Sequence, residues 1–317
     1  MSTTRQPLPP AFEAWPRAPL DEWSATRDTL HMWTQIVGKV RLALAPMINH
    51  WWQVPLYVSA RGLTTSAIPA GDRTVEMEFD FCDHQLHVRS SDGEERRVAL
   101  EPKPVAAFYH QTMAALEALG VEVAIRPTPV EVESTTPFPD DTGPRSYRPE
   151  HARRFWAQLT SAQRVLLEFR AGFIGKVSPV HFFWGAMDLA VTRFSGRPAP
   201  PHPGGAPNLA DRVMVEAYSH EVSSCGYWPG GSAEGSFYSY AYPEPEGYAR
   251  RPVRPSAAAY SAEAGEFLLP YEAVRTAADP DRALMEFLQS TYEAAADTAG
   301  WDRDALELHP ERSMAHH

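Results

Sequence analysis

IVGKVRLALAPMINHWWQVPLYVSAR (residues 36–61) and FIGKVSPVHFFWGAMDLAVTR (residues 173–193) follow the same order of residue types. Each reads as the end of an amphipathic helix with Gly-Lys in its last turn, then a Pro, a His beside aromatic residues, and an apolar strand that ends on an Arg. This order predicts two related halves around one shared cleft. Three pairs of residues would occupy related positions there: Lys39 and Lys176, His50 and His181, Arg61 and Arg193.

Apolar periodicity predicts the elements of the first half, residues 20–133. Leu30, Trp33 and Val37 recur at a spacing of three or four and therefore share one face of a helix. In the segment TVEMEFDFCD, apolar residues alternate with acidic ones, as in a strand with one wet face. In chain order we expect a helix at residues 20–45, strands at 52–60 and 74–83, a hairpin at 87–100, a helix at 104–119 and a short strand at 121–125.

A second half, residues 150–303, is predicted to repeat the order of the first. Residues 134–149 combine Pro, Gly, Ser, Thr and Asp without periodicity, so we interpret them as a linker. Residues 1–19 and 304–317 would then be an N-terminal extension and a C-terminal tail. The expected elements are a long helix at 149–174, a strand region at 180–194, a proline-rich loop at 195–211, strands at 235–245 and 266–271, and a helix at 281–299.

The order of elements favours an α+β fold with antiparallel sheets and flanking helices, in two pseudo-repeated halves. A doubly wound Rossmann fold is not expected, because no GxGxxG motif follows a strand and opens a helix. Gly175 and Lys176 lack the Walker spacing and fall at the end of a predicted helix instead of its start. A phosphate-cradling loop is therefore not expected either.

Composition narrows the class of protein. With 317 residues and 44% hydrophobic content, the chain can build one large domain or two ordinary ones. A net charge of -11 argues against nucleic acid as a partner. The sequence has no membrane-spanning apolar run and no apolar signal core, so we expect a cytoplasmic protein without a membrane partner. Cys82 and Cys225 lie far apart without CxxC spacing and are expected to be buried thiols.

Long blocks along almost the whole chain carry a family resemblance. They are LHMWTQIVGKVRLALAPMINHWWQVPLYVSARGLTTS, SPVHFFWGAMDLAVTRFSGRPAPP, EAYSHEVSSCGYWPGG, YAYPEPEG, FLLPYEAVR and FLQSTYEAAADTAGWDR. Together, from about Trp15 to Trp301, they resemble a bacterial domain family of unknown function, number 5996. The resemblance implies no activity and no site residues, because that family has no assigned mechanism.

Three histidines and one glutamate are the candidate acid–base or metal-binding residues. If the two repeated strands lie near residues 216–231, His50, His181 and His220 would meet Glu221, a set suited to zinc or iron. Against a metal, none of these residues has the short spacing of HxH or HExxH. Histidines flanked by aromatic residues are also commonly core residues that donate to a backbone carbonyl.

The basic residues of the two blocks have two interpretations each. Lys39 and Lys176 either stabilise helix C-termini, with Gly supplying the chain reversal, or bind a ligand's carboxylate or phosphate. Arg61 and Arg193 either bind an anion in the cleft or form internal salt bridges. Asp188 stands inside an apolar run, so it is either the ion-pair partner of a core cation or a general base with a raised pKa.

Aromatic residues gather in the same segments and predict the wall of a small-molecule pocket, although a sheet–helix core would bury the same residues. Among them Trp184 and Trp228 are candidate ligand contacts, and Gln53 could orient a ligand through its amide. Tyr238, Tyr240 and Tyr242 alternate along one predicted strand, which makes either a hydroxyl-lined wall or a solvent-facing ladder.

These observations lead to one main hypothesis and two alternatives. The first is a cytoplasmic enzyme that acts on a small anionic or aromatic molecule between the two halves, with zinc or iron as the candidate cofactor. The second is a non-catalytic small-molecule binding protein, and the third is a structural or partner-binding protein whose aromatic residues are only core. The sequence does not predict the substrate or the oligomeric state.

Overall fold

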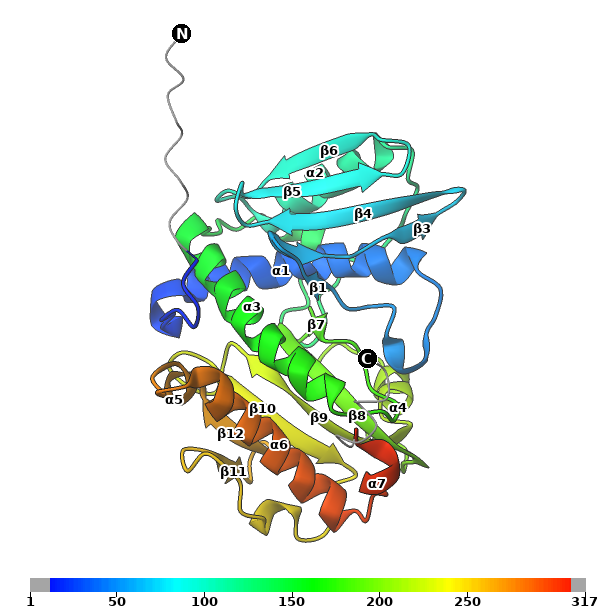
Figure 1. The fold of residues 1–317 in the computed structure, drawn as a ribbon. Helices are drawn as coiled ribbons and strands as arrows, with labels where there is room; N and C mark the ends of the chain where they lie inside the picture. Colours follow the sequence, from blue (N-terminus) through cyan, green and yellow to red (C-terminus); the bar gives the residue numbers. More distant parts are fainter. Residues whose placement is uncertain (1–11, 309–317) are drawn as a thin grey trace, which may run out of the picture.

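A computed structural model describes residues 12–308 and contains two antiparallel sheets, one from each half of the chain (Figure 1). Most of the predicted N-terminal extension (1–19) and C-terminal tail (304–317) therefore lies outside the described residues. Helices flank both sheets, so the predicted α+β class is confirmed.

The first sheet has the strand order β1-β2-β4-β5-β6, and β3 also pairs with β4. Its strands are β1 (Tyr57–Val58), β2 (Gly62–Thr64), β3 (Ile68–Ala70), β4 (Arg73–Asp80), β5 (Gln85–Ser90) and β6 (Glu95–Ala99), and its helices are α1 (Leu20–Leu44) and α2 (Val105–Glu117). Phe79 of β4 stacks on Phe108 of α2, and Phe108 stacks on Trp33 of α1 at 4.5 Å between ring centroids. The apolar side of the alternating strand is thus buried against both helices.

The second sheet has the order β11-β12-β10-β9-β8-β7. Its strands are β7 (His181–Phe183), β8 (Asp188–Pro198), β9 (His220–Trp228), β10 (Ser236–Tyr242), β11 (Ala259–Ser261) and β12 (Glu266–Pro270). The helices are α3 (Pro149–Ala171), α4 (Asp211–Ala217), α5 (Tyr271–Arg275), α6 (Pro280–Thr298) and α7 (Arg303–Leu306), with 3-10 turns η1 (Asn49–Trp51), η2 (Phe138–Asp140) and η3 (Tyr248–Arg250). Figure 1 shows α3 and α6 side by side in front of this sheet.

Strand β8 divides the second half into two environments. Leu189, Val191 and Arg193 point toward α3 and α6, where Arg193 contacts the ring of Phe169. The residues between them point to the opposite face of the sheet, which α3 and α6 leave uncovered. That second face carries the candidate site.

Most of the predicted elements are confirmed within a few residues, with three corrections. The strand expected at 52–60 is reduced to β1, because residues 52 and 53 form a turn after η1. No helix or strand covers residues 121–133, so the strand expected at 121–125 is wrong. The interpretation of Gly38 and Lys39 as a helix end is also wrong, because α1 continues to Leu44. Lys176 lies beyond the end of α3, so the two lysines do not occupy related positions and the internal repeat is not confirmed.

The segment interpreted as a linker is packed against the core. Phe138 and Tyr147 are 1% and 3% exposed, and Ser146 accepts a hydrogen bond from Thr29 of α1 at 2.7 Å. Proline and glycine therefore mark an irregular but well-packed connection here.

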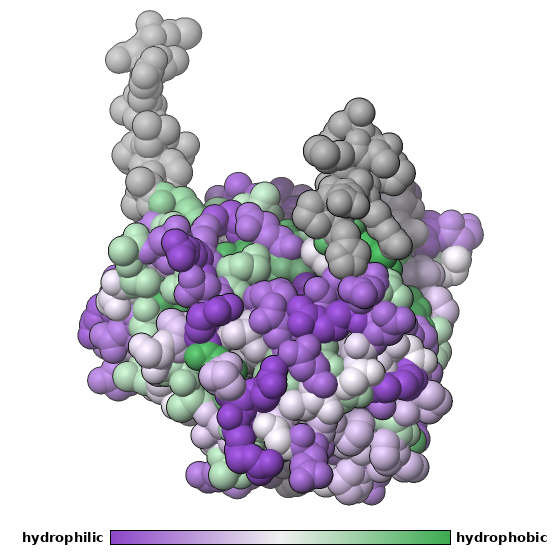
Figure 2. Space-filling model, turned by 60° about the horizontal axis from the view of Figure 1, so that its bottom comes forward, coloured by the Kyte–Doolittle hydropathy of each residue, from purple (hydrophilic) through white to green (hydrophobic). Residues whose placement is uncertain are grey.

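The face of the molecule shown in Figure 2 is mostly polar. Hydrophilic residues cover most of the face shown in Figure 2, with small apolar groups scattered between them. None of the helices in residues 12–308 is long and apolar enough to cross a membrane.

Candidate functional site

A cavity of about 850 Å³ lies on the second face of the β8–β10 sheet. Residues from both halves of the chain line it: the C-terminal part of α1, η1 and residues 124–131 from the first half, and the sheet with α4 from the second. Its apolar and aromatic lining includes Leu42, Trp51, Trp52, Val54, Phe183, Phe194, Leu209, Val213, Met214 and Trp228. A volume of this size suits a small organic molecule.

Asp188 and Tyr238 lie on the sheet that forms the floor of the cavity. The Tyr238 hydroxyl donates a hydrogen bond to Oδ2 of Asp188, and Asp188 has no cationic partner among the described residues. Burial raises the pKa of Asp188 to about 6. Gly226 of β9 allows this pair to form, because a Cβ at that position would lie 2.7 Å from the Tyr238 hydroxyl.

Two further carboxyl groups face the same cavity. Burial, followed by the nearby charge of Asp188, raises the pKa values of Glu131 and Glu266 to about 7. The side chain of Glu131 is accessible to solvent, yet surrounding protein removes much of its hydration. Neither glutamate forms an ion pair within residues 12–308, whereas the buried Glu234 pairs with Arg275 at 2.8 Å. The floor thus holds three carboxyl groups that can be protonated near neutral pH.

The backbone around Glu131 is held in an unusual conformation. Glu131 has φ of 57°, and its amide donates to the carbonyl of Pro207 at 2.7 Å. The amide side chain of Gln35, buried in α1, makes two hydrogen bonds to the backbone of Val130 at 2.8 and 2.9 Å. These contacts fix the position from which Glu131 reaches the cavity.

Left-handed backbone conformations gather at this cavity. Eight non-glycine residues within the described ranges have positive φ, and four of them line the cavity. The four are His50, Trp51, Glu131 and Asn208. Such conformations cost roughly 1–3 kcal/mol each and concentrate at functional sites, so their distribution favours a site here.

Hydroxyl groups extend the polar part of the floor. The hydroxyls of Tyr218 and Tyr240 lie 2.7 Å apart, and those of Thr192 and Ser224 lie 2.9 Å apart. Burial raises the pKa of Tyr240 to about 12, so this phenol keeps its proton at neutral pH. The tyrosine alternation in β10 therefore lines the cavity at Tyr238 and Tyr240.

Lys39 stands on another wall of the cavity. It is 5% exposed and makes no hydrogen bond or ion pair with any described residue; its Nζ lies 5.7 Å from the ring centroid of Trp184. Burial, with a smaller contribution from the charge of Arg126, lowers the pKa of Lys39 to about 8. The cavity thus has a basic wall and an acidic floor.

Gly38 brings Trp184 directly onto α1, since a Cβ on Gly38 would overlap the indole ring. Gly38→Ala is therefore expected to lower the free energy of unfolding by about 2 kcal/mol through overpacking, although Ala normally favours a helix. Urea denaturation measures the change. In the background of Trp184→Leu, Gly38→Ala should cost almost nothing, and a cost that stays at about 2 kcal/mol in that background would exclude the indole as the cause.

The histidines and Glu221 do not gather into one cluster. The rings of His50 and His220 lie 5.6 Å apart, but His181 is enclosed by Trp52, Tyr57 and Phe183. Burial, followed by the charges of Arg41 and Arg170, lowers the pKa of His181 to about 3, and neither of its ring nitrogens has a hydrogen-bond partner. No group of three or more His, Cys, Asp or Glu side chains in residues 12–308 is arranged to bind a metal ion.

Three of these four residues have other polar partners, and for His220 the partner is the Ser219 hydroxyl, 3.1 Å from Nδ1. Lys176 donates to Nε2 of His50 at 2.6 Å, and Nδ1 of His50 faces the carbonyl oxygen of Ala217 at 3.2 Å. Burial and the charge of Lys176 lower the pKa of His50, which lines the cavity. Glu221 pairs with Arg197 at 2.7 Å outside the cavity.

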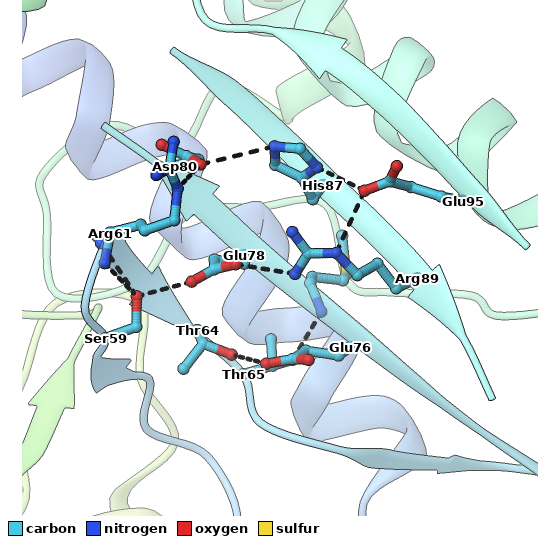
Figure 3. A network of polar contacts seen from close by, with 12 residues as sticks. Ser59, Arg61, Thr64, Thr65, Glu76, Glu78, Asp80, His87, Arg89 and Glu95 are labelled. Carbon is cyan, nitrogen blue, oxygen red and sulfur yellow. Dashed lines mark hydrogen bonds and ion pairs between the residues drawn. The ribbon is translucent and has the colours of Figure 1, made fainter. Parts of the chain in front are cut away.

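Both predicted anion-binding arginines lie away from the cavity. Arg61 forms ion pairs with Asp80 and Asp83. Figure 3 shows Arg61 and Asp80 within a polar network on one face of the first sheet. Arg193 lies on the helix-facing side of β8, with its guanidinium 3.5 Å from the ring centroid of Phe169 and 4.3 Å from that of Tyr292. Arg61 thus forms the internal salt bridges of the structural alternative, whereas Arg193 has no ion pair among the described residues and instead donates to the carbonyl of Phe169.

Three candidates remain: Trp228 lines the cavity, whereas Trp184 and Gln53 make internal hydrogen bonds. Trp228 lines the cavity and is 40% exposed. Trp184 is buried and donates from Nε1 to the carbonyl of Val54 at 3.0 Å. Gln53 stabilises its own loop. Its Oε1 accepts a hydrogen bond from the amide of Ile48, and its backbone carbonyl accepts one from Nε of Arg41.

The cavity therefore contains four of the predicted residues: Lys39, His50, Asp188 and Trp228. It also contains residues that were not predicted as site residues, chiefly Arg126, Glu131, Tyr218, Ser224 and Glu266. The tyrosines of β10 had a readable signal in their alternation. Glu131 had none, because its position depends on a backbone turn and on Gln35, almost a hundred residues earlier in the chain.

Comparison with known proteins identifies the family. No curated protein and no solved structure matches the chain. Residues 15–308 match a family of unknown function, DUF5996. The match covers nearly the whole chain, and the protein belongs to that family.

Proposed function

We propose that the protein is an enzyme that binds a small molecule with an apolar or aromatic body in this cavity and transfers protons to or from it. One observation carries the proposal: Asp188, Glu131 and Glu266 share the cavity, none of them forms an ion pair within residues 12–308, and loss of hydration moves their pKa values toward neutrality. Carboxyl groups with such pKa values are effective general acids and bases at physiological pH.

The arrangement supports a division of roles among these groups. Tyr238 donates to Asp188, which favours the ionised form of that carboxyl and makes it the stronger candidate for the general base. Glu131 and Glu266, with pKa values of about 7, hold a proton more often and are candidates for the general acid. The aromatic wall around Trp51, Trp52 and Phe183 would bind the body of the ligand.

A non-catalytic binding protein is the second candidate. The extent of the apolar lining favours it, since an enclosed apolar wall binds a ligand whether or not a reaction follows. Under this alternative, the carboxyl groups would bind the polar end of the ligand and the protein would release it unchanged.

A fluorescent probe tests the binding that both candidates require. N-phenyl-1-naphthylamine is uncharged and fluoresces in apolar surroundings, and we expect it to bind the wild-type protein. Ala217→Phe fills the cavity from α4, a helix without buried residues, and should weaken binding at least tenfold. Met285→Leu on the outer helix α6 is the control and should leave binding unchanged. Equal binding by all three proteins would contradict the cavity as the binding site.

Metabolites that displace the probe then separate the two candidates. Incubation of each with the protein, followed by mass spectrometry or proton exchange in deuterated water, detects turnover. Asp188→Asn should abolish turnover while probe binding persists. Glu221→Gln changes a residue outside the cavity and should retain both turnover and probe binding. If metabolites displace the probe but none of them is converted, the result favours the non-catalytic alternative.

A further inference from the structure

Lysine is rare in this sequence, and its three occurrences differ in their surroundings. The chain has Lys39, Lys103 and Lys176 against 26 arginines. Lys103 donates to Gln111 at 2.7 Å and lies 3.3 Å from a carboxylate oxygen of Glu101. Lys176 donates to His50 at 2.6 Å. Lys39 alone among the three has neither a hydrogen bond nor an ion pair within residues 12–308.

Apart from the ring of Trp184, whose centroid lies 5.7 Å from Nζ, the surroundings of Lys39 offer no partner for a charged side chain. It is 95% buried, since 5% of its surface remains exposed, and that surface faces the cavity. Its nearest described charge is the cation of Arg126, which destabilises an ammonium group. An apolar residue would fill this position at a lower desolvation cost. An amine in such a place is typical of lysines that act as nucleophiles.

We propose that the amine of Lys39 forms a reversible Schiff base with an aldehyde or ketone bound in the cavity. This inference rests on the proposed function, because it requires that a small molecule enters. It identifies the substrate class as a carbonyl compound with an apolar or aromatic body, and it makes Lys39 the covalent attachment point.

The step conserves atoms and electrons without a further reactant. The lone pair of the neutral amine attacks the carbonyl carbon, and the oxygen takes up a proton to give a carbinolamine. Nitrogen loses its two protons in the course of the reaction, oxygen leaves with two protons as water, and a C=N bond remains. No group is oxidised or reduced. The carboxyl groups of the floor can supply and accept the protons in transit.

Two features of the site favour this step over simple binding of an anion. At pH 7, a pKa of about 8 leaves about one Lys39 amine in ten unprotonated, against about one in three thousand for an ordinary lysine. Asp188, Glu131 and Glu266 in the same cavity would also repel an anionic group when ionised. The neutral amine and the nearby proton donors both suit an uncharged carbonyl.

Reductive trapping tests the proposal on the full-length protein. Benzaldehyde and sodium cyanoborohydride at pH 7 convert an imine into a stable benzylamine, and peptide mapping locates it. We expect a benzyl adduct on Lys39, formed at least tenfold faster than on Nα-acetyl-lysine in the same solution. Relative to ordinary lysine, this advantage should shrink above pH 8, because Lys39 is by then largely unprotonated.

Matched variants distinguish the possible outcomes. Lys103→Arg and Lys176→Arg should keep the adduct, whereas Lys39→Arg should lose it while retaining the positive charge. Lys39→Met provides a second variant if the guanidinium disturbs folding, which thermal denaturation reports. Adducts confined to Lys103, Lys176 or the N-terminal amine would overturn the proposal.

The fluorescent probe separates this proposal from the proposed function. Wild-type protein that binds N-phenyl-1-naphthylamine but gives no adduct on Lys39 would overturn the Schiff base and leave the cavity intact. If no adduct forms, and benzoate displaces the probe from the wild type and from Lys39→Arg but not from Lys39→Met, Lys39 binds anions instead and the proposal is overturned. Failure of the probe to bind would contradict the proposed function itself.

Discussion

Asp188→Asn is expected to raise the free energy of unfolding at pH 8 by about 3 kcal/mol. Burial raises the pKa of Asp188 from 3.8 to about 6, and each unit corresponds to about 1.4 kcal/mol. A carboxyl group with a raised pKa stabilises the fold below about pH 4, and that stability is lost as the pH rises through about 6. Asparagine is neutral throughout and its oxygen can still accept the hydrogen bond from Tyr238.

Urea denaturation at two pH values measures this effect. The variant should exceed the wild type at pH 8 and match it at pH 4. Asp80→Asn is the matched control, because Asp80 is also buried but its pKa is lowered: the bonds from Arg61 and from the amides of Cys82 and Asp83 outweigh the effect of burial. Asp80→Asn should therefore destabilise the protein at pH 8. A loss of stability in Asp188→Asn at pH 8 would show that its carboxylate is well solvated in the folded protein.

Gly226→Ala is expected to lower the free energy of unfolding by about 3 kcal/mol, the upper end of the range for overpacking. Gly226 lies in β9 between β8 and β10, and a Cβ there would overlap the carbonyl oxygen of Leu189. That oxygen belongs to the backbone of a paired strand and cannot move aside as a side chain could. The methyl group would also displace the Tyr238 hydroxyl and weaken its bond to Asp188.

Chemical denaturation and a pH titration follow the two consequences of Gly226→Ala. Gly143→Ala is the control: its nearest neighbour would be an oxygen of Asp141 at 3.7 Å, so the change should stay within about 0.5 kcal/mol. Without the Tyr238 hydrogen bond, the pKa of Asp188 should rise further above its ordinary value. A variant as stable as Gly143→Ala would mean that β8 and β9 can separate at this point without cost.

The sequence predicted the regular elements well because their signals are local. Two of these signals repeat within a few residues: the apolar face of α1 with Leu30, Trp33 and Val37, and the alternation of apolar and acidic residues in β4. The predicted helix and the predicted strand were both confirmed. Residues 121–133 also alternate in polarity, but here no partner strand is available and the segment is tied to other parts of the chain instead. Glu131 bonds to Pro207, and Asn208 bonds to the carbonyl of Val132.

The candidate site was predictable only in part, because sequence order does not specify which face a residue points to. Asp188 and Arg193 were considered as a possible ion pair, yet five positions apart on a strand they face opposite sides of the sheet. Lys39 and His50 were predicted from an internal repeat that the structure does not confirm. Both line the cavity, but Lys39 does so from α1 and His50 from η1. Glu266 and Glu131 join them only through tertiary folding.

The two sides of β8 impose different constraints on neighbouring residues. A deep mutational scan should show a period of two: Leu189, Val191 and Arg193 would tolerate few replacements, because each one changes the core beneath α3 and α6. Replacements at Ala190, Thr192 and Phe194 would instead change the cavity wall and, under the proposed function, the preference for a ligand. Relatives could therefore diverge in specificity by single substitutions on one side of a strand while inheriting an unaltered scaffold.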